Sequence, residues 1–116
     1  MREIKFRAWD SQDKIMIQED VLVLPWDNSR WKLMQFTGLT DKNEKEIYEG
    51  DIVSNGKEVK FGQFYAYLEN GLGDGYYITG FYFKNDDGID EPVESGQDVL
   101  GNIYENPELL KEGVKE

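Results

Sequence analysis

Cysteine and histidine are both missing from this chain of 116 residues. Without cysteine there is no disulfide, no thiolate nucleophile and no metal held by thiolates. Without histidine the chain lacks the commonest general base, the commonest metal ligand and the one side chain that titrates near neutrality unperturbed. The sequence therefore predicts a protein that is not an enzyme, with no catalytic residue, no cofactor and no metal site.

Long hydrophobic runs are also missing. The chain begins with Met1, Arg2 and Glu3 and has no apolar stretch of the kind that forms a secretory signal. The longest apolar runs, at residues 21–26 and 80–83, are far shorter than a membrane span. We expect a cytoplasmic protein that does not enter a membrane.

Positive charge is scarce in the second half of the chain. Residues 1–60 carry 10 Lys and Arg against 12 Asp and Glu, a net charge of −2, whereas residues 61–116 carry 3 against 12, a net charge of −9. Binding to phosphates requires clustered basic side chains, so this half argues against nucleic acid as a ligand. An acidic surface favours solubility, which is the simpler interpretation, or attraction to a basic partner.

Aromatic residues are plentiful, with three Trp, seven Tyr and six Phe. Disordered chains are poor in such residues, so the chain is expected to fold. Its length fits a single domain over residues 1–116. A folded chain of this size buries roughly two-thirds of the surface of its unfolded form, enough for a core without disulfides.

The first third of the chain alternates in the manner of strands. Ile4, Phe6 and Ala8 alternate with Lys5, Arg7 and Trp9, which is the period of a half-buried strand. Residues 15–17 resume an extended pattern after a polar turn, which predicts a hairpin. The apolar run 21–24 is too short for a stable helix and predicts a buried strand. Residues 31–37 predict another strand, with Met34 and Phe36 on one face and Trp31, Leu33 and Gln35 on the other.

Turn signals follow at close intervals. Residues 40–45 form a polar turn, in which a left-handed residue would fall on Asn43 if one is needed. Residues 49–51 predict a tight corner at Gly50. Asn-Gly at residues 55–56 predicts a further hairpin.

The last third predicts long strands and one helix. Residues 76–83 are expected to form a strand broken at Gly80, and residues 89–97 an acidic loop. A final strand at residues 99–104 has a candidate bulge at Gly101. Capping by Asn106, Pro107 at the first helical position and a stop at Gly113 then predict a short helix. Frequent turns between short strands favour an all-β barrel or folded sheet.

Adjacent aromatic residues in the strands at 64–68 and 76–83 point to opposite faces of a sheet. One face belongs to the core, and the other is either covered by the helix and the N-terminal strands or meets another chain. Two tryptophans flank a loop, where they either anchor an interface or pack in the core. Base stacking on these aromatics is opposed by the acidic charge around them. The candidate interaction surface comprises Trp26, Trp31, Tyr65, Tyr67, Tyr76, Tyr77 and Tyr82.

Other candidate sites are weaker. The glycines of residues 71–75 precede a strand rather than the helix that a phosphate loop requires. Residues 41–46 lack the glycine and the final glutamate of a calcium loop. The carboxylates of residues 86–94 are more typical of a solvated loop than of a cation site. Among 24 acidic residues some pair must lie at catalytic spacing, but the sequence does not single one out.

Two motifs resemble the YopX-like family of phages and prophages. They are G-L-x-D-x-N-x-x-E-I-Y-E-G-D-I-V at residues 38–53 and G-N-I-Y-E-N-P-E-L-L at residues 101–110. The resemblance implies a small phage accessory protein with a mainly β fold, in which a mixed sheet is partly folded on itself. It implies no activity, so it transfers no functional residue.

Together these observations predict an all-β domain, a mixed, largely antiparallel sheet partly folded on itself into a barrel-like form with a short C-terminal helix. We expect a non-enzymatic accessory protein that acts by binding another protein, as a homo-oligomer. An alternative is that the acidic half imitates DNA and occupies a basic host or phage protein. A less favoured alternative is an enzyme or ligand binder that uses a carboxylate pair in a barrel mouth.

Overall fold

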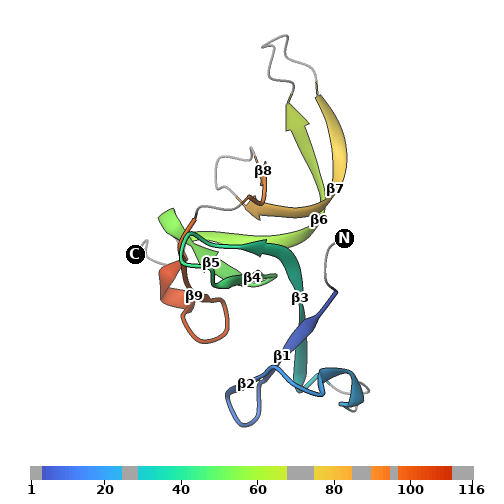
Figure 1. Cartoon of the computed structure of the whole chain (residues 1–116), viewed down its shortest axis with the longest axis vertical. Coiled ribbons are helices and arrows are strands. Elements are labelled where there is room, and N and C mark those ends of the chain that lie inside the picture. Colours follow the sequence, from blue (N-terminus) through green and yellow to red (C-terminus); the bar gives the residue numbers. More distant parts are fainter. Residues whose placement is uncertain (1–3, 25–28, 68–74, 85–89, 95–96, 111–116) are drawn as a thin grey trace.

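The computed structural model describes residues 4–24, 29–67, 75–84, 90–94 and 97–110. Within these segments the chain forms nine strands in two antiparallel sheets, with three single-turn 3₁₀ helices (Figure 1). No helix in these segments is long and apolar enough to span a membrane. The strands are β1 (Phe6–Asp10), β2 (Ile15–Ile17), β3 (Trp31–Thr40), β4 (Glu46–Tyr48), β5 (Asp51–Val53), β6 (Lys57–Tyr67), β7 (Gly75–Lys84), β8 (Glu91–Pro92) and β9 (Val99–Asn102).

The first sheet has the order β2-β1-β3-β4. The predicted N-terminal hairpin is confirmed, since Ala8 pairs with Ile17 across an antiparallel register. β3 alternates as expected, with Met34 and Phe36 buried and Leu33 exposed. The alternation in the sequence therefore predicted which residues of β3 share a face. In β1, by contrast, all residues from Arg7 to Asp10 are buried.

The second sheet has the order β8-β7-β6-β5-β9 and curls into a half-barrel. The core cluster of Ile47, Val53, Val59 and Phe83, each at most 2% exposed, packs this sheet against β4 of the first sheet. Figure 1 shows β3 and the lower part of β6 curving around the short strands β4 and β5. The all-β, barrel-like prediction is confirmed, and every strand pairing in the described segments is antiparallel.

The corner at residues 49–51 has the predicted geometry. Gly50 has φ +89°, a left-handed conformation that side chains other than hydrogen disfavour. A Cβ atom at Gly50 would also lie 3.0 Å from Sδ of Met34. The corner turns β4 directly into β5, and Tyr48 donates its backbone N–H to Asp51 at 2.7 Å.

Two predicted elements are wrong. The apolar run expected to be a strand forms a 3₁₀ turn, Val21–Val23, entered through Asp20 in a left-handed conformation. The predicted C-terminal helix is only a 3₁₀ turn, Pro107–Leu109, after which Leu110 is extended. The side chain of Asn106 makes no cap hydrogen bond; its Oδ1 instead accepts the backbone N–H of Asn102 at 3.3 Å. The expected stop at Gly113 lies outside the described residues.

Smaller expectations are also corrected. The left-handed residue of the polar turn is Glu44 (φ 66°) rather than Asn43. β7 continues through Gly80 without a break, opposite Gly62. Part of the expected acidic loop forms β8, which pairs with β7. The bulge in β9 is present, and its register makes Leu100 the extra residue.

Candidate interaction surface

The hairpin of β6 and β7 extends beyond the rest of the fold (Figure 1). We define its outer part, residues 63–67 and 75–79, as the arm. β5 pairs with β6 only at Lys57 and Glu58, and β8 pairs with β7 only at Tyr82 and Phe83. In the described part of the chain the arm is therefore a two-stranded ribbon whose two edges lack a strand partner.

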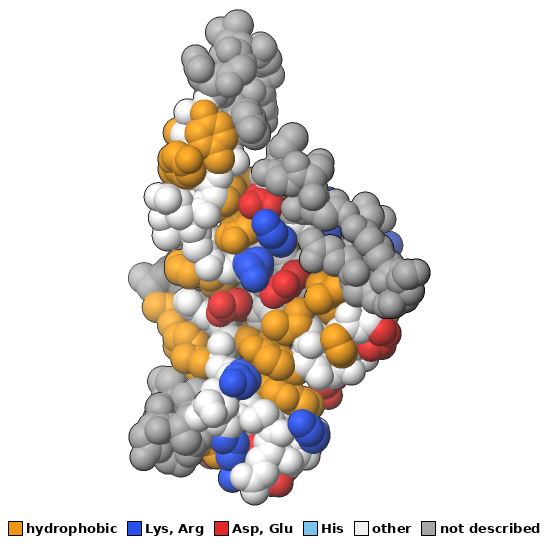
Figure 2. Space-filling view, turned by 180° about the vertical axis from the view of Figure 1, so that it is seen from behind, with side chains coloured by type: hydrophobic (Ala, Val, Ile, Leu, Met, Phe, Trp, Pro, Cys, Tyr) orange, Lys and Arg blue, Asp and Glu red, His pale blue; other side chains and the backbone are white. Residues whose placement is uncertain are grey.

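The arm exposes tyrosines on both of its faces. Tyr76 is 54% exposed and Tyr77 is 67% exposed, and as neighbours in a strand they point to opposite sides. Tyr77 lies opposite Tyr65 in the register, and their rings meet edge to face at 5.1 Å. Figure 2 shows hydrophobic side chains gathered on the arm next to the tip that is drawn in grey.

The base of the arm is packed rather than exposed. Phe64 is 3% exposed, and the half-buried ring of Tyr82 stacks on it at 5.0 Å across the paired glycines Gly62 and Gly80. Because these glycines have no side chains, the two rings can lie flat against the ribbon. Tyr82 thus belongs partly to the packing of the arm.

The structure does not bring all predicted surface residues together. Trp31 begins β3 at the far end of the first sheet, opposite Asp10 and away from the arm (Figure 1). Its ring packs under the guanidinium of Arg30 at 4.4 Å, and its buried Nε1 has no hydrogen-bond partner. Trp26 and the side chain of Tyr67 lie outside the described residues. The surface is therefore a set of arm tyrosines rather than a joint tyrosine and tryptophan patch.

The polar turn after β3 is built around one buried carboxylate. Asp41 is 5% exposed and accepts the backbone N–H groups of Asn43 (2.8 Å), Lys45 (2.9 Å) and Val99 (3.0 Å). These bonds, with that from Val99 as the largest cause, lower the pKa of Asp41 although burial acts in the opposite direction. The carboxylate holds the turn together, and three of its roughly four acceptor positions are taken by backbone N–H groups.

A second buried carboxylate, Asp10, pairs with Arg30. Nε and Nη2 of Arg30 donate to the two carboxylate oxygens at 2.7 and 2.8 Å. These hydrogen bonds lower the pKa of Asp10 well below its usual range, against a raising effect of burial. Backbone N–H groups of Gln12 and Asp13 add to the lowering, so this pair secures the turn of the first hairpin.

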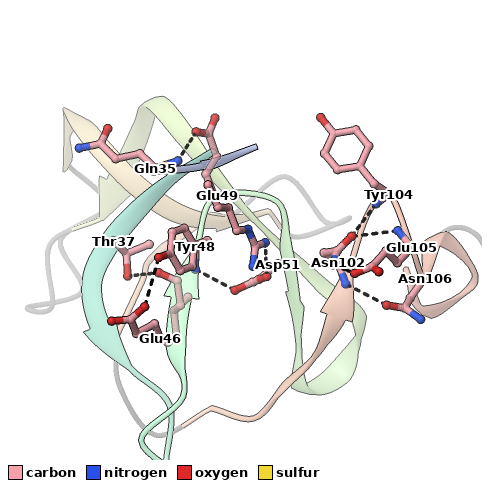
Figure 3. A network of polar contacts seen from close by, with 12 residues as sticks. Gln35, Thr37, Glu46, Tyr48, Glu49, Asp51, Asn102, Tyr104, Glu105 and Asn106 are labelled. Atoms are coloured by element: carbon pink, nitrogen blue, oxygen red, sulfur yellow. Dashed lines mark hydrogen bonds and ion pairs between the residues drawn. The ribbon is translucent and has the colours of Figure 1, made fainter. Parts of the chain in front are cut away.

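The two sheets are joined by an ion pair that the sequence did not reveal. Nη2 of Arg7 in β1 donates to Oδ1 of Asp51 in β5 at 2.5 Å, and both side chains are at most 8% exposed. The guanidinium also lies over the ring of Tyr48 at 4.5 Å. Burial raises the pKa of Asp51, while the Arg7 charge and the N–H of Tyr48 (Figure 3) act to lower it. The one available signal was the position of Asp51 in the motif at residues 38–53.

Two clefts near these ion pairs contain few acidic side chains that could act together on a ligand. A cleft of about 350 Å³ is lined by Asp51 and Glu105, but Asp51 is bonded to Arg7 and Glu105 accepts the side-chain amide of Asn102 at 2.7 Å. A second cleft of about 330 Å³ over the half-barrel has no acidic lining residue. The described segments contain no group of three or more carboxylates that could hold a metal ion. Asp86 and Asp87 lie outside those segments.

The family model for YopX protein matches residues 22–111. The chain belongs to the YopX family. Its structure is similar to the crystal structure of protein EF1440 from Enterococcus faecalis, with 25% sequence identity and a TM-score of 0.50, over 95% of this chain and 99% of that chain. No curated protein matches this YopX family member.

Proposed function

We propose that this YopX family member is a non-enzymatic phage or prophage accessory protein that acts in the bacterial cytoplasm by binding another protein through its arm. The observation that carries the proposal is the two-stranded ribbon with exposed tyrosines on both faces. An isolated two-stranded hairpin is marginally stable in water, so a third strand or a packed face would stabilise it. Exposed tyrosines are frequent anchors of protein interfaces.

We further propose that the partner is a second copy of this chain. The described arm residues, 63–67 and 75–79, include no charged side chain. Two copies of a protein with a net charge of −11 can therefore meet at the arm without placing like charges in contact. The edges of the arm pair with no other strand in the described segments, so two ribbons could pair there by main-chain hydrogen bonds.

Sedimentation equilibrium over a wide concentration range tests this proposal. The expected result is a reversible rise toward the dimer mass, with arm amides protected from hydrogen exchange on association. Replacing both exposed tyrosines, Tyr76→Ser and Tyr77→Ser, should weaken association by at least about thirtyfold, the effect of losing one interface hot spot. The control is Ile15→Ser, which removes a 51% exposed apolar side chain from β2, far from the arm. A wild-type protein that stays monomeric at millimolar concentration would refute self-association.

A second candidate function is capture of a basic host or phage protein by an acidic surface. It is favoured by the net charge of −9 on residues 61–116. Such capture should weaken steeply as salt is raised, because exposed charges are screened within about 8 Å at physiological ionic strength. Capture that is insensitive to salt would contradict it.

A further inference from the structure

A groove separate from the arm lies between β3, the start of β6 and the segment that follows β9. Its volume is about 250 Å³. Pockets for drug-sized ligands begin at about 300 Å³, so this groove is suited to one long side chain rather than to a whole cofactor. The residues that give it its chemistry are Leu33, Glu49, Glu58, Phe61, Ile103 and Tyr104.

Two carboxylates of the groove have spare hydrogen-bonding capacity. Glu58 meets Lys60 at 3.6 Å, beyond the range of a normal hydrogen bond. In the described part of the chain, Glu49 accepts only the backbone N–H of Gln35, at 3.4 Å. An ionised carboxylate offers about four acceptor positions, so most positions on both groups remain available.

Both carboxylates line the groove together with the aromatic residue Tyr104. Burial raises the pKa of Tyr104, and the negative charges of Glu49 and Glu58 raise it further. Figure 3 shows Glu49 and Tyr104 extending to the same side of the structure, whereas Glu46 extends to the other. The groove therefore brings together two carboxylates and one aromatic ring, with Lys60 as its one basic lining residue among those that the structure describes.

The walls of the groove are apolar and partly exposed. Leu33 is 43% exposed and Phe61 is 49% exposed. The ring of Tyr104 is supported from behind by Trp9, stacked at 6.1 Å with 12° between the planes. Aromatic faces beside carboxylates attract a cation through both ring quadrupole and charge, and the attraction grows as water is excluded.

We propose that this groove receives an arginine side chain presented by a basic partner protein, with its guanidinium between Glu49 and Glu58 and its aliphatic stem against Leu33 and Phe61. The negative charges of Glu49 and Glu58 favour a positively charged side chain in the groove. Arginine fits better than lysine because its planar fork can bond two carboxylates and stack on a ring at once. Lys60, at 42% side-chain exposure on the edge of the groove, competes weakly for Glu58.

The inference gives a specific site to the capture of a basic protein and does not depend on self-association through the arm. Glu49 and Glu58 are outside the arm, so a variant with both arm tyrosines replaced should retain the groove. Failure of one proposal therefore leaves the other open to test.

The probe is a fluorescein-labelled peptide with two arginines flanked by leucines, compared with the same peptide carrying citrulline, a neutral isostere, at both positions. Binding is measured by fluorescence anisotropy at low and physiological salt, with the full chain titrated to saturation into a fixed low concentration of the labelled peptide. The groove variant is Glu49→Gln with Glu58→Gln. The matched control, Glu19→Gln with Glu94→Gln, changes the net charge equally at two exposed positions that line none of the clefts described above.

The groove variant should bind the arginine peptide about tenfold or more weakly than the wild type, and the control should change by less than about twofold. Lys60→Gln should tighten binding, because it removes the competing cation. Equal losses in both double variants would show that only overall charge matters and would overturn the proposal. Undiminished binding of the citrulline peptide, or weaker binding after Lys60→Gln, would overturn it as well. Thermal unfolding of each variant establishes that it is folded.

Discussion

Removing one partner of the buried ion pair between Arg7 and Asp51 should lower the stability of the fold strongly. Two unit charges about 4 Å apart attract by about 4 kcal/mol at an effective dielectric constant of 20. Replacing Arg7 with Met keeps most of the aliphatic volume over Tyr48 but leaves the Asp51 carboxylate buried with one N–H donor, from Tyr48. Removing one partner of a buried pair typically costs about 3–5 kcal/mol.

The loss of folding stability caused by Arg7→Met has an upper limit, because Asp51 can take up a proton when the variant folds. From an ordinary pKa of about 3.9, protonation at pH 7 costs roughly 4 kcal/mol, and at pH 5 roughly 1.5 kcal/mol. In the variant, burial raises the folded pKa of Asp51 above its unfolded value with no cation opposing it. The penalty is therefore small near pH 4 and grows as pH rises toward the folded pKa.

Two further variants complete the test. Asp51→Asn leaves Arg7 charged at every accessible pH and should cost about 3–5 kcal/mol. Because the folded pKa of Asp51 is raised in the wild type, this cost should not increase between pH 5 and pH 7. The double variant Arg7→Met with Asp51→Asn has no buried charge and keeps an acceptor for the Tyr48 N–H. It should lie within about 2 kcal/mol of the wild type at both pH values.

Urea unfolding followed by tryptophan fluorescence at pH 5 and pH 7 measures all four proteins, each compared with the wild type at the same pH. A penalty for Arg7→Met that is equal at both pH values would refute the protonation argument. A double variant as unstable as the worse single variant would show that the pair contributes through shape and not through charge.

Three other outcomes follow from the structure. Asp10→Asn should remove part of the stability that the wild type loses in acid. Because the pKa of Asp10 is depressed in the folded state, its contribution to stability is present above pH 4 and is lost as pH falls through the folded pKa. Acid unfolding curves of the two proteins measure this difference. Gly50→Ala should cost about 1–2 kcal/mol, because of its φ of +89° and the contact with Met34, whereas Gly80→Ala, which meets no atom within 4 Å, should change stability by less than about 1 kcal/mol in chemical denaturation. Phe64→Ala should cost about 3–5 kcal/mol by the same measurement, because its ring is buried beneath Tyr82; a cost below about 1 kcal/mol would contradict that packing.

Strands with alternating side chains could be predicted because their signal is local. β3 buries Met34 and exposes Leu33 as the period of two requires, and the corner at Gly50 follows from the conformational freedom of glycine. The helix prediction at Asn106 was wrong because it relied on capping preference. The side chain of Asn106 bonds to Asn102 instead, so the turn it leads into is not capped.

Sites that join distant segments could not be predicted. The arm tyrosines were found because Tyr76 and Tyr77 are adjacent in sequence, which fixes them on opposite faces. Trp31 was assigned to the same surface, yet the pairing of β3 with β1 places it elsewhere. The groove of Glu49, Glu58 and Tyr104 forms only when the sheets curl, which no local pattern encodes.

The bonds of the Asp41 carboxylate determine when its turn can be completed as the chain is synthesised on the ribosome. It accepts an N–H from Val99, 58 positions further along the chain, and β5 takes its second neighbour from β9. Until those last strands leave the exit tunnel, the polar turn lacks one of its three bonds and one side of β5 is uncovered. The polar turn and β5 therefore reach their full set of hydrogen bonds only after β9 has been synthesised and has paired with β5.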